Sequence, residues 1–483
     1  MSQSKKQSSS FNRRDFLKTG ALSGLFLGSG AFLNGCSSQT TKKTKPGDVK
    51  NIIFLVSDGM STGTLTATDQ LLRARYDRPS HWISLYEQGR VNRGLMDMTS
   101  ATSVVTDSAA AACSWGCGRR MINGRVNIDE NDQPVKPILK ICKEAGKSTG
   151  LVTTATVTHA TPAGFAANVI DRGDEQTIAL QYLDREYDVI LGGGARHMDS
   201  NRREDGRDLF AEFASAGYHV AKTKSEMEAH QGRQKLLGTF YSGHLPYNID
   251  HIHSEDYLNT IPTLAEMTEK ALSTLSLNPE GFIVQIEGAR VDHAAHSNDV
   301  SGLIYDQIAF DDAVAAAVAF AENRDDTLII ITTDHGNANP ALNGAGPYYN
   351  SSADMFSQVA DFKQSTGWLL HQLNENSSVS QIREMVEHVT TLQIKAQEAE
   401  YLQRALAGRY QAIYSPMSGA SQVMGQILAN YTAFNWVGDA HTSDYVELAA
   451  MGAGQEYIGA FTRNTDLFDL MVELTGMHAY AAS

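Results

Sequence analysis

Several residue types are scarce in this sequence, and each shortage excludes a class of protein. Its 483 residues contain only four cysteines, which are too few for a disulfide-stapled scaffold, and no cysteine pair stands near a histidine at zinc-finger spacing. Positive charge is also scarce, with 40 lysines and arginines against 55 acidic residues and a formal net charge of −15. A body this acidic argues against nucleic acid as the main partner. Proline is rare, at 11 residues against 40 glycines, which suits an α/β enzyme with many tight turns.

The apolar run near the N-terminus, ALSGLFLGSGAFLNG, is too short and too rich in glycine for a good membrane span. It follows the basic segment NRRDFLK at residues 12–18. A basic start, a short apolar stretch and a small-residue end predict a signal peptide. The arginine pair resembles the twin-arginine signal, which exports folded bacterial proteins. We therefore expect an exported, periplasmic protein.

The predicted signal peptide, residues 1–36, ends in LNGC, which looks like a lipobox. In this interpretation Cys36 is the acylated first residue of the mature protein and attaches it to the membrane. The alternative is ordinary cleavage nearby, which leaves Cys36 without a role. Residues 37–47, SSQTTKKTKPG, then form a polar tether.

The rest of the sequence predicts an α/β fold. Apolar residues make up 42% of the chain, enough to bury a sizeable core. Short continuous apolar runs predict buried parallel strands, and helical patterns lie between them. This alternation predicts a three-layer αβα fold with a central, mostly parallel sheet. The predicted strands are Asn51–Ser57, Ser148–Thr153, Asp188–Leu191, Phe282–Ile286, Thr327–Thr332 and Asp444–Ala450, and the predicted helices include Lys136–Ala145, Asp208–Ala216, Thr263–Leu277, Ile304–Glu322 and Thr465–Leu474.

Residues 346–435 interrupt the alternation. This segment is polar, has no obvious buried strand and predicts two or three helices, at Val379–Val389, Leu392–Tyr410 and Ala420–Tyr431. We interpret it as a helical insertion that caps or rims the site, or that builds a subunit contact. The catalytic core then comprises residues 48–345 and 436–483.

Acidic and imidazole side chains follow several predicted strands directly. Because ligands of open α/β sheets bind at the carboxyl ends of the strands, these groups should share one edge. So many carboxylates need compensation, since like charges raise each other's pKa. Divalent metals supply it, and mixed Asp and His ligands suit zinc while all-oxygen ligands suit magnesium. Taken singly, each residue could instead be a helix N-cap, part of a solvated helix face or part of a turn. The group comprises Asp58, Glu287, Asp292, His296, Asp334 and His335.

A candidate nucleophile stands at a predicted helix start. Asp107-Ser108-Ala109 opens a run of small residues, and a serine at this position is most often a helix cap. No general base stands beside Ser108 in the sequence, but coordination to zinc could ionise its hydroxyl directly. The N-terminus of the helix also favours a bound anion.

Six segments, taken in order, resemble the motifs of alkaline phosphatases. They are NIIFLVSDGM, VVTDSAAAA, THATPAGFAANVIDR, IEGARVDHAAH, TTDHGN and GDAHTSDYV. The resemblance runs from about residue 50 to the C-terminus, with residues 346–435 poorly matched. Any one motif alone is a weak signal, whereas six in the same order are a strong one.

The resemblance implies a role for each matching residue. Ser108 would be the nucleophile that becomes phosphoserine, and Arg172 would grip the phosphate oxygens. Without the resemblance, His441 reads as a loop histidine, Thr161 as a turn residue and Arg172 as a surface charge. The implied ligands are Asp292, His296 and His441 for one zinc, Asp58, Asp334, His335 and the Ser108 oxygen for a second zinc, and Asp58, Thr161 and Glu287 for magnesium.

Two positions depart from the enterobacterial branch of this family. His159 and His293 stand where that branch has Asp and Lys, and animal and several marine bacterial members resemble this chain there. A histidine in place of Asp removes a carboxylate that would orient magnesium-bound water, which puts the metal of the third site in question. His159, His293 and Asp107 could instead support the ligands by hydrogen bonds.

The resemblance implies an enzyme that hydrolyses small phosphate monoesters with two Zn²⁺ and one Mg²⁺. Family members are commonly homodimers. One alternative is another member of the superfamily, such as a phosphodiesterase, sulfatase or phosphomutase. No sulfatase-like sequence surrounds Ser108, and diesterases usually lack an arginine at the position of Arg172. The other alternative is a non-catalytic lipoprotein that binds metal or phosphate.

Overall fold

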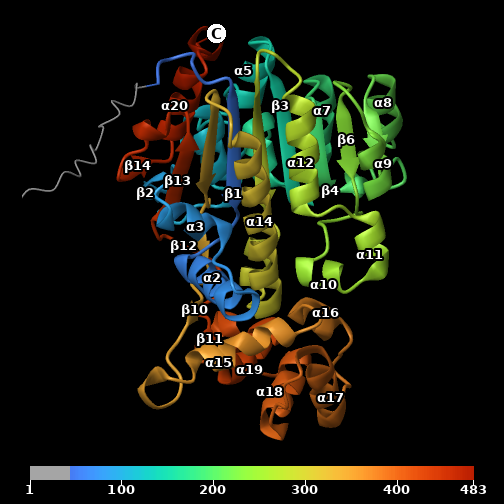
Figure 1. The fold of residues 1–483 in the computed structure, drawn as a ribbon. Coiled ribbons are helices and arrows are strands. Elements are labelled where there is room, and N and C mark those ends of the chain that lie inside the picture. Colours follow the sequence, from blue (N-terminus) through green and yellow to red (C-terminus); the bar gives the residue numbers. More distant parts are fainter. Residues whose placement is uncertain (1–43, 483) are drawn as a thin grey trace, which may run out of the picture. The chain divides into compact units, whose positions relative to one another are not determined.

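The computed structural model describes residues 44–482, and its α/β unit is shown in Figure 1. The predicted signal peptide, Cys36 and most of the predicted tether lie outside these residues. The tether was expected to extend to residue 47. Residues 44–47 are instead hydrogen-bonded to the α/β unit, since Gly47 N donates to Leu474 O at 2.9 Å and Gly454 N donates to Thr44 Oγ1 at 3.0 Å.

A ten-stranded sheet forms the centre of the unit, in the order β14-β2-β13-β8-β1-β7-β3-β4-β6-β5. Only β13 runs antiparallel to its neighbours, β2 and β8. The prediction of a mostly parallel sheet with helices on both faces is confirmed (Figure 1). The strands are β1 (Asn51–Ser57), β2 (Asn92–Asp97), β3 (Ser148–Thr156), β4 (Val189–Gly193), β5 (His219–Ala221), β6 (Leu236–Thr239), β7 (Phe282–Gly288), β8 (Thr327–Thr332), β13 (Val446–Gly452) and β14 (Phe461–Arg463).

The central strands are apolar because both of their faces are covered. All seven residues of β1 are buried, and successive side chains point to opposite faces of the sheet. Ile53 and Leu55 therefore join one hydrophobic cluster, while Ile52 and Phe54 join the other. Burial on both faces explains why β1 and β8 read as continuous apolar runs and lie where the sequence predicts them.

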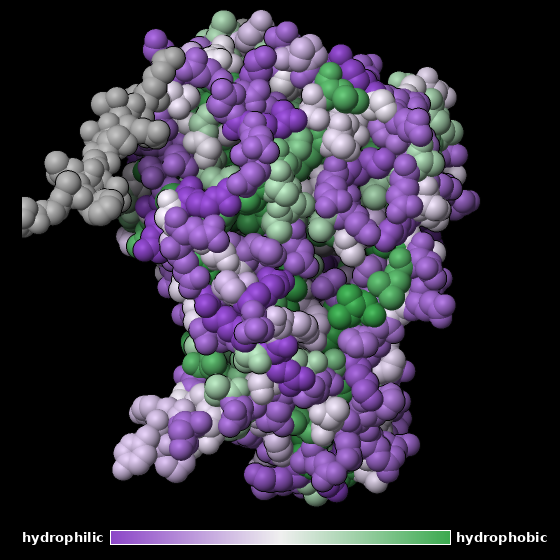
Figure 2. All heavy atoms as spheres, in the orientation of Figure 1, coloured by the Kyte–Doolittle hydropathy of each residue, from purple (hydrophilic) through white to green (hydrophobic). Residues whose placement is uncertain are grey.

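Helices cover both faces and divide between the two clusters. The first cluster is covered by α2 (Thr62–Tyr76), α3 (His81–Glu87), α9 (Lys224–Ala229), α10 (Asn248–Ile252), α11 (Glu255–Thr260), α12 (Leu264–Leu275), α13 (Arg290–His296) and α14 (Val300–Ala321). The second is covered by α4 (Ser108–Cys117), α5 (Ile138–Glu144), α6 (Ala160–Ala166), α7 (Glu175–Asp184), α8 (Leu209–Ser215), α20 (Asp466–Leu474) and α21 (His478–Ala481). Polar residues predominate on the face shown in Figure 2.

The segment 346–435 is helical, but it holds more helices than the two or three predicted. They are α15 (Ser352–Ser357), α16 (Thr366–His371), α17 (Val379–Thr390), α18 (Ala396–Leu406) and α19 (Ala420–Thr432). The antiparallel pair β10 (Ala341–Leu342) and β11 (Phe434–Asn435) joins the two ends of the segment. Gln422 Nε2 of α19 donates to His296 O at 2.9 Å, so the insertion contacts a predicted ligand directly.

No helix within residues 44–482 is both long enough and apolar enough to cross a membrane.

Candidate metal centre

Four neighbouring parallel strands, β8, β1, β7 and β3, end at one edge of the sheet and carry most of the predicted ligands. Asp58 follows β1, Glu287 lies near the end of β7, and Asp334 with His335 follow β8. The short helix α13 after β7 adds Asp292 and His296. His441 lies on β12 (His441–Thr442), which pairs with β9 (Gly336–Asn337), directly after His335. The chain thus brings together the residues that the sequence separates by almost 400 positions.

The first group of side chains lies around the candidate nucleophile. Ser108 Oγ is buried at the N-terminus of α4, 3.4 Å from His335 Nε2. The same imidazole nitrogen lies 3.0 Å from Asp334 Oδ2 and 3.7 Å from Asp58 Oδ1. Asp58, Asp334 and His335 place one ligand atom each within 4.8 Å of one another. Three side chains and one hydroxyl therefore converge as the sequence suggests for the second zinc.

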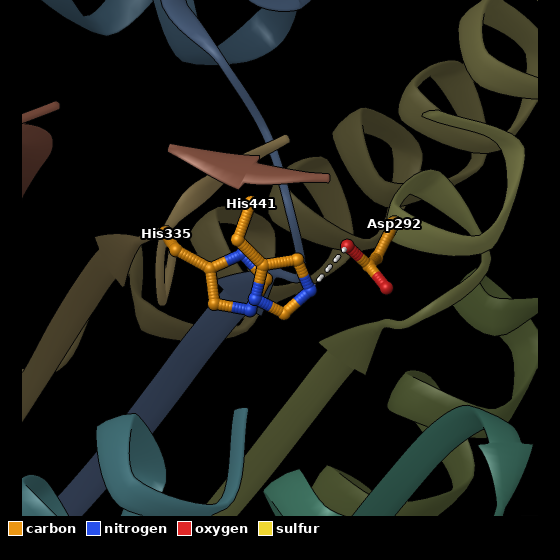
Figure 3. Close-up of side chains that lie close together, drawn as sticks. All are labelled: Asp292, His335 and His441. Carbon is orange, nitrogen blue, oxygen red and sulfur yellow. Dashed lines mark ion pairs between the residues drawn. The ribbon is translucent and has the colours of Figure 1, made fainter. Parts of the chain in front are cut away.

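The second group contains Asp292, His296 and His441. Asp292 Oδ2 lies 3.3 Å from His296 Nε2, and Asp292 Oδ1 lies 3.7 Å from His441 Nε2. Figure 3 shows His441 and Asp292 facing each other, with the ring of His335 stacked on that of His441 at 3.6 Å between centroids. Asp292, His335 and His441 also satisfy the spacing of a metal site. His335 therefore lies between the two groups.

The two imidazoles of this second group are held with their Nε2 atoms facing each other at 3.0 Å. Their Nδ1 atoms lie 2.6 Å from Asp439 O in His296 and 2.9 Å from Thr106 O in His441. Because a carbonyl only accepts, each Nδ1 must carry a proton, so in the neutral form of each ring the Nε2 lone pair is free to bind a metal ion. Two such lone pairs repel at this distance unless a cation or a proton lies between them. The arrangement therefore fits a shared metal ion.

The third group lies between β1, β7 and α6. Thr161 Oγ1 lies 3.4 Å from Asp58 Oδ2, and Thr153 Oγ1 donates to Glu287 Oε2 at 2.5 Å. Asp58, His159 and Glu287 are close enough to share a metal. The structure thus brings His159 to the expected magnesium position together with Thr161, so this site offers nitrogen as well as oxygen.

Burial makes the site strongly dependent on positive charge. Burial raises the pKa of Asp58 well above its usual value, and the charges of Asp334 and Asp292 raise it further. Burial likewise raises the pKa of Glu287 to about 7. Burial would lower the pKa of His296, but the hydrogen bond and charge of Asp292 outweigh it and raise that pKa to about 9. All three shifts favour the more positive form of the group, as expected where several carboxylates are buried together.

Unpaired oxygens at the same edge support this interpretation. Asp58 Oδ1 and Glu287 Oε1 are buried and make no hydrogen bond to any described residue. Buried carboxylate oxygens normally have partners, because leaving them unpaired costs several kcal/mol in effective desolvation. Divalent cations would satisfy these oxygens and neutralise the carboxylates. The residues present therefore fit the implied metals.

Arg172 reaches this centre from the loop before α7. Its Nη1 lies 3.0 Å from Asp107 Oδ2, and its Nη2 lies 3.3 Å from His159 Nε2. Asp107 is the N-cap of α4, where its Oδ1 accepts from Ala110 N at 2.9 Å. The carboxylate thus fixes the guanidinium relative to Ser108. Arg172 is therefore partly buried and ordered by an ion pair, unlike an ordinary surface charge.

Three supporting residues were not found from the sequence. Asn337 Nδ2 donates to Asp292 Oδ1 at 2.6 Å, and Thr153 orients Glu287 as described. The ring of His244 packs against His293 at 4.5 Å and against His159 at 5.5 Å between centroids. Asn337 lies within the quoted TTDHGN motif, so the motif carried a signal. Thr153 and His244 show no local pattern that marks them.

Comparisons with known proteins agree with this geometry. A family model described as alkaline phosphatase matches residues 49–477. Alkaline phosphatase 4 of Bacillus subtilis is 30% identical over 454 residues, which cover 92% of this chain and 93% of that protein. Streptomycin-6-phosphate phosphatase of Streptomyces griseus is 32% identical over 349 residues, which cover 63% of this chain and 78% of that protein.

Solved structures give the same result. The alkaline phosphatase of Thermus thermophilus is 33% identical with a TM-score of 0.82, and the match covers 93% of this chain and 96% of that one. A cold-active alkaline phosphatase from a psychrophilic Shewanella is 25% identical with a TM-score of 0.73, covering 88% of this chain and 99% of that one. Members of this family are metal-dependent hydrolases, as the converging ligands require. Because the family model covers most of the sequence, this chain belongs to the alkaline phosphatase family.

Proposed function

We propose that this protein hydrolyses phosphate monoesters to an alcohol and phosphate through a phosphoserine at Ser108. The observation that carries the proposal is the placement of the Ser108 hydroxyl. It lies at the N-terminus of a buried helix, 3.4 Å from His335 Nε2, in a site where the buried oxygens Asp58 Oδ1 and Glu287 Oε1 make no hydrogen bond to any described residue.

The ligand sets follow from the three groups. Asp292, His296 and His441 would hold one zinc, Asp58, Asp334, His335 and Ser108 the second, and Asp58, Thr161 and Glu287 the magnesium. When bound, these cations would act as Lewis acids that stabilise the charge on the attacking and leaving oxygens. The identity of the metal in the third site needs its own measurement, because His159 lies there. Its imidazole nitrogen is a ligand that suits a transition metal and that magnesium does not prefer.

The chain's own residues supply binding and orientation. The Arg172 guanidinium offers a planar fork of donors that suits two nonbridging oxygens of a phosphate group. Asp107 and His159 hold that fork in place, and the N-terminus of α4 favours the anion beside Ser108. Phosphoryl transfer needs mostly positioning and charge stabilisation, which these groups provide.

The reaction would proceed in two displacements at phosphorus. In the first, Ser108 Oγ loses its proton and bonds to phosphorus as the bond to the alcohol oxygen breaks, and that oxygen leaves as the alcohol after taking up a proton. In the second, water attacks the phosphoserine, the Oγ–P bond breaks, and Ser108 recovers a proton while phosphate leaves. The sum is a monoester and water converted into an alcohol and phosphate.

Ser108→Ala tests the nucleophile. We expect the purified variant to bind the same amount of zinc as wild type, but to form no phosphoserine with radiolabelled substrate and to lose most turnover. Metal analysis and acid-quenched labelling measure both quantities. Normal turnover in this variant would contradict the proposal. Activity on a bis-aryl phosphate that exceeds activity on an aryl phosphate would instead favour a phosphodiesterase.

Export by the twin-arginine route, a periplasmic location and lipid attachment at Cys36 are also part of this proposal. They rest on the NRRDFLK and LNGC segments alone. Cys36→Ser should leave export intact but move the protein from the membrane fraction to the soluble periplasmic fraction. A homodimer is proposed from the family, and sedimentation of the purified protein tests it.

A further inference from the structure

A hollow lies away from the metal centre, at the carboxyl ends of β4, β6 and β5. Its volume is about 470 Å³, within the range of small-molecule sites. The carboxyl ends of parallel strands are where α/β sheets bind ligands. The lining comprises Ala195, Arg196, Asp199, Arg202, Phe210, Lys222, Thr239, Phe240, Tyr241 and Ser242.

Positive charge predominates in this hollow, although the chain as a whole is acidic. Arg196, Arg202 and Lys222 line it together with a single carboxylate, Asp199. Within the described part of the chain, no carboxylate lies within ion-pair distance of Arg202 or Lys222. Lys222 Nζ instead lies 4.0 Å above the ring of Phe210, which holds the ammonium at the hollow. Neither cation therefore forms an ion pair with a described carboxylate, although the charge of Asp199 acts on both.

The single carboxylate is itself engaged. Asp199 Oδ1 accepts from Asn201 N and from Asn201 Nδ2, both at 3.0 Å. Among the three cations, only Arg196 lies within ion-pair distance of a described carboxylate, with its Nη2 3.7 Å from Glu175 Oε1. The hollow therefore keeps a net positive charge near Arg202 and Lys222, where an anion would be attracted.

A buried hydroxyl gives a second, independent observation. Thr239 is only 1% exposed, lines the hollow, and its Oγ1 has no hydrogen-bond partner among the described residues. Side chains alternate along β6, so Thr239 lies on the same face as Leu237. Leu237 belongs to the cluster against which Phe210 packs, so Thr239 faces the same side as Phe210. A buried hydroxyl without a partner destabilises the folded state, and a bound oxyanion would satisfy it.

The hollow is separate from the proposed catalytic machinery. Ser108, Arg172 and the candidate metal ligands do not line it. It holds no cluster of His and carboxylate groups at metal-ligand spacing. We infer that this hollow is a second, non-catalytic oxyanion site that binds a phosphate group through Arg202, Lys222 and Thr239.

Two sources could supply this phosphate group, namely the orthophosphate product or a second phosphoryl group on a larger substrate. Phosphate suits the site because charged donors and a hydroxyl can share its oxygens. The volume exceeds what one phosphate fills, and Phe210 and Tyr241 offer apolar surface beside it. An organic portion of a phosphorylated compound would occupy that surface.

Inorganic phosphate is the first probe, titrated calorimetrically into the metal-loaded Ser108→Ala protein. We expect two binding events. Arg172→Ala should weaken the first event, whereas Arg202→Ala/Lys222→Ala should weaken the second at least about tenfold, because each cation makes a charge-assisted hydrogen bond. Lys363→Ala/Arg409→Ala removes the same charge from exposed positions elsewhere and should change neither event. A single binding event, or a second one that the pocket variant retains, would overturn the inference.

Thr239→Val tests the hydroxyl without altering the shape or charge of the hollow. In phosphate-free buffer we expect a melting temperature equal to or above that of the parent, since an unpaired buried hydroxyl is removed. The rise in melting temperature on adding phosphate should become smaller. A lower melting temperature without phosphate, together with an unchanged response to phosphate, would show that the hydroxyl is structural and would contradict the role of Thr239.

A substrate comparison distinguishes the two sources. If a distal phosphoryl group occupies the hollow, Arg202→Ala/Lys222→Ala should raise KM for an alkane bisphosphate but not for nitrophenyl phosphate. If the product occupies it, only the second phosphate-binding event should change. The inference does not require the proposed catalysis, because calorimetry reports the second event even if the protein shows no turnover.

Discussion

Asn337 offers the sharpest test of how the metal centre is held. Its Nδ2 donates to Asp292 Oδ1 at 2.6 Å, inside a fully buried environment. A hydrogen bond to a charged group contributes about 1.5–3 kcal/mol, and a tenfold change in affinity corresponds to about 1.4 kcal/mol. Asn337→Ala should therefore weaken zinc binding about 10- to 100-fold, as found for groups that orient metal ligands elsewhere. The variant keeps its backbone N–H to Ser61 Oγ, so β9 should stay in place.

The measurement is competition for zinc with a chromophoric chelator, followed by folding checks on the metal-free forms. Asn337→Asp is a second variant of nearly the same size, which replaces the donor with a further carboxylate and should weaken binding at least as much. Asn343→Ala is the matched control, because Asn343 Nδ2 bonds only to Ala341 O at an exposed position. Wild-type zinc affinity in both Asn337 variants would refute the reasoning that Asn337 positions Asp292.

Three further predictions concern the nucleophile's surroundings and the buried carboxylates. Arg172→Ala should weaken inhibition by inorganic phosphate about 10- to 100-fold while leaving detectable turnover, because it removes a charge-assisted fork of donors; steady-state inhibition measures this, and an unchanged inhibition constant would count against the role of Arg172. Gly59→Ala should lower metal content, because Gly59 has φ +69 and a Cβ there would lie 2.4 Å from Asp292 Oδ1; elemental analysis checks it, and full metal occupancy would contradict the expected clash. Asp306→Asn should flatten the pH dependence of stability, because burial raises the pKa of Asp306 to about 7, against the opposing charge of Arg290 and the Asn248 N–H, with Asp250 and Asp299 nearby. The folded state favours the protonated form of Asp306, so its stabilising contribution is full below about pH 4 and is lost as pH rises through about 7, by at most ~4 kcal/mol. Denaturant titrations at pH 5 and 8 measure the free energy of unfolding of both proteins. An equal change in that free energy between the two pH values in wild type and variant would show that this carboxyl does not titrate as stated.

The sequence predicted the centre of the sheet better than its edges. Asn51–Ser57 and Thr327–Thr332 are buried on both faces, so their continuous apolar runs were unambiguous. The strand β2 was missed because exposed and part-buried residues alternate along it, without an apolar run. The strands β5 and β6 are only three and four residues long, which is too short for a periodic signal.

The residues of the candidate site likewise fall into those that a sequence pattern predicts and those that it does not. Ligands at or just after the end of a strand, such as Glu287, Asp58 and Asp334, could be found from pattern alone, because strand ends share one edge. His441 could not, because its position depends on pairing between β12 and β9, each only two residues long. His441 was identified by family resemblance. Thr153 and His244 depend on long-range packing that no local pattern records.

The insertion imposes a constraint on how this chain can vary. Asp439, just beyond it, anchors the ring of His296, while Gln422 on α19 binds the carbonyl of the same residue. Gly425 of α19 lies against Asn298, where an added Cβ would approach within 2.7 Å. A one-residue length change between 420 and 440 should therefore displace the imidazole of His296, whereas α17, which makes neither of these contacts, should tolerate more variation. Natural and engineered variation in loop length should accordingly be tolerated at the far end of the insertion and purged next to His296.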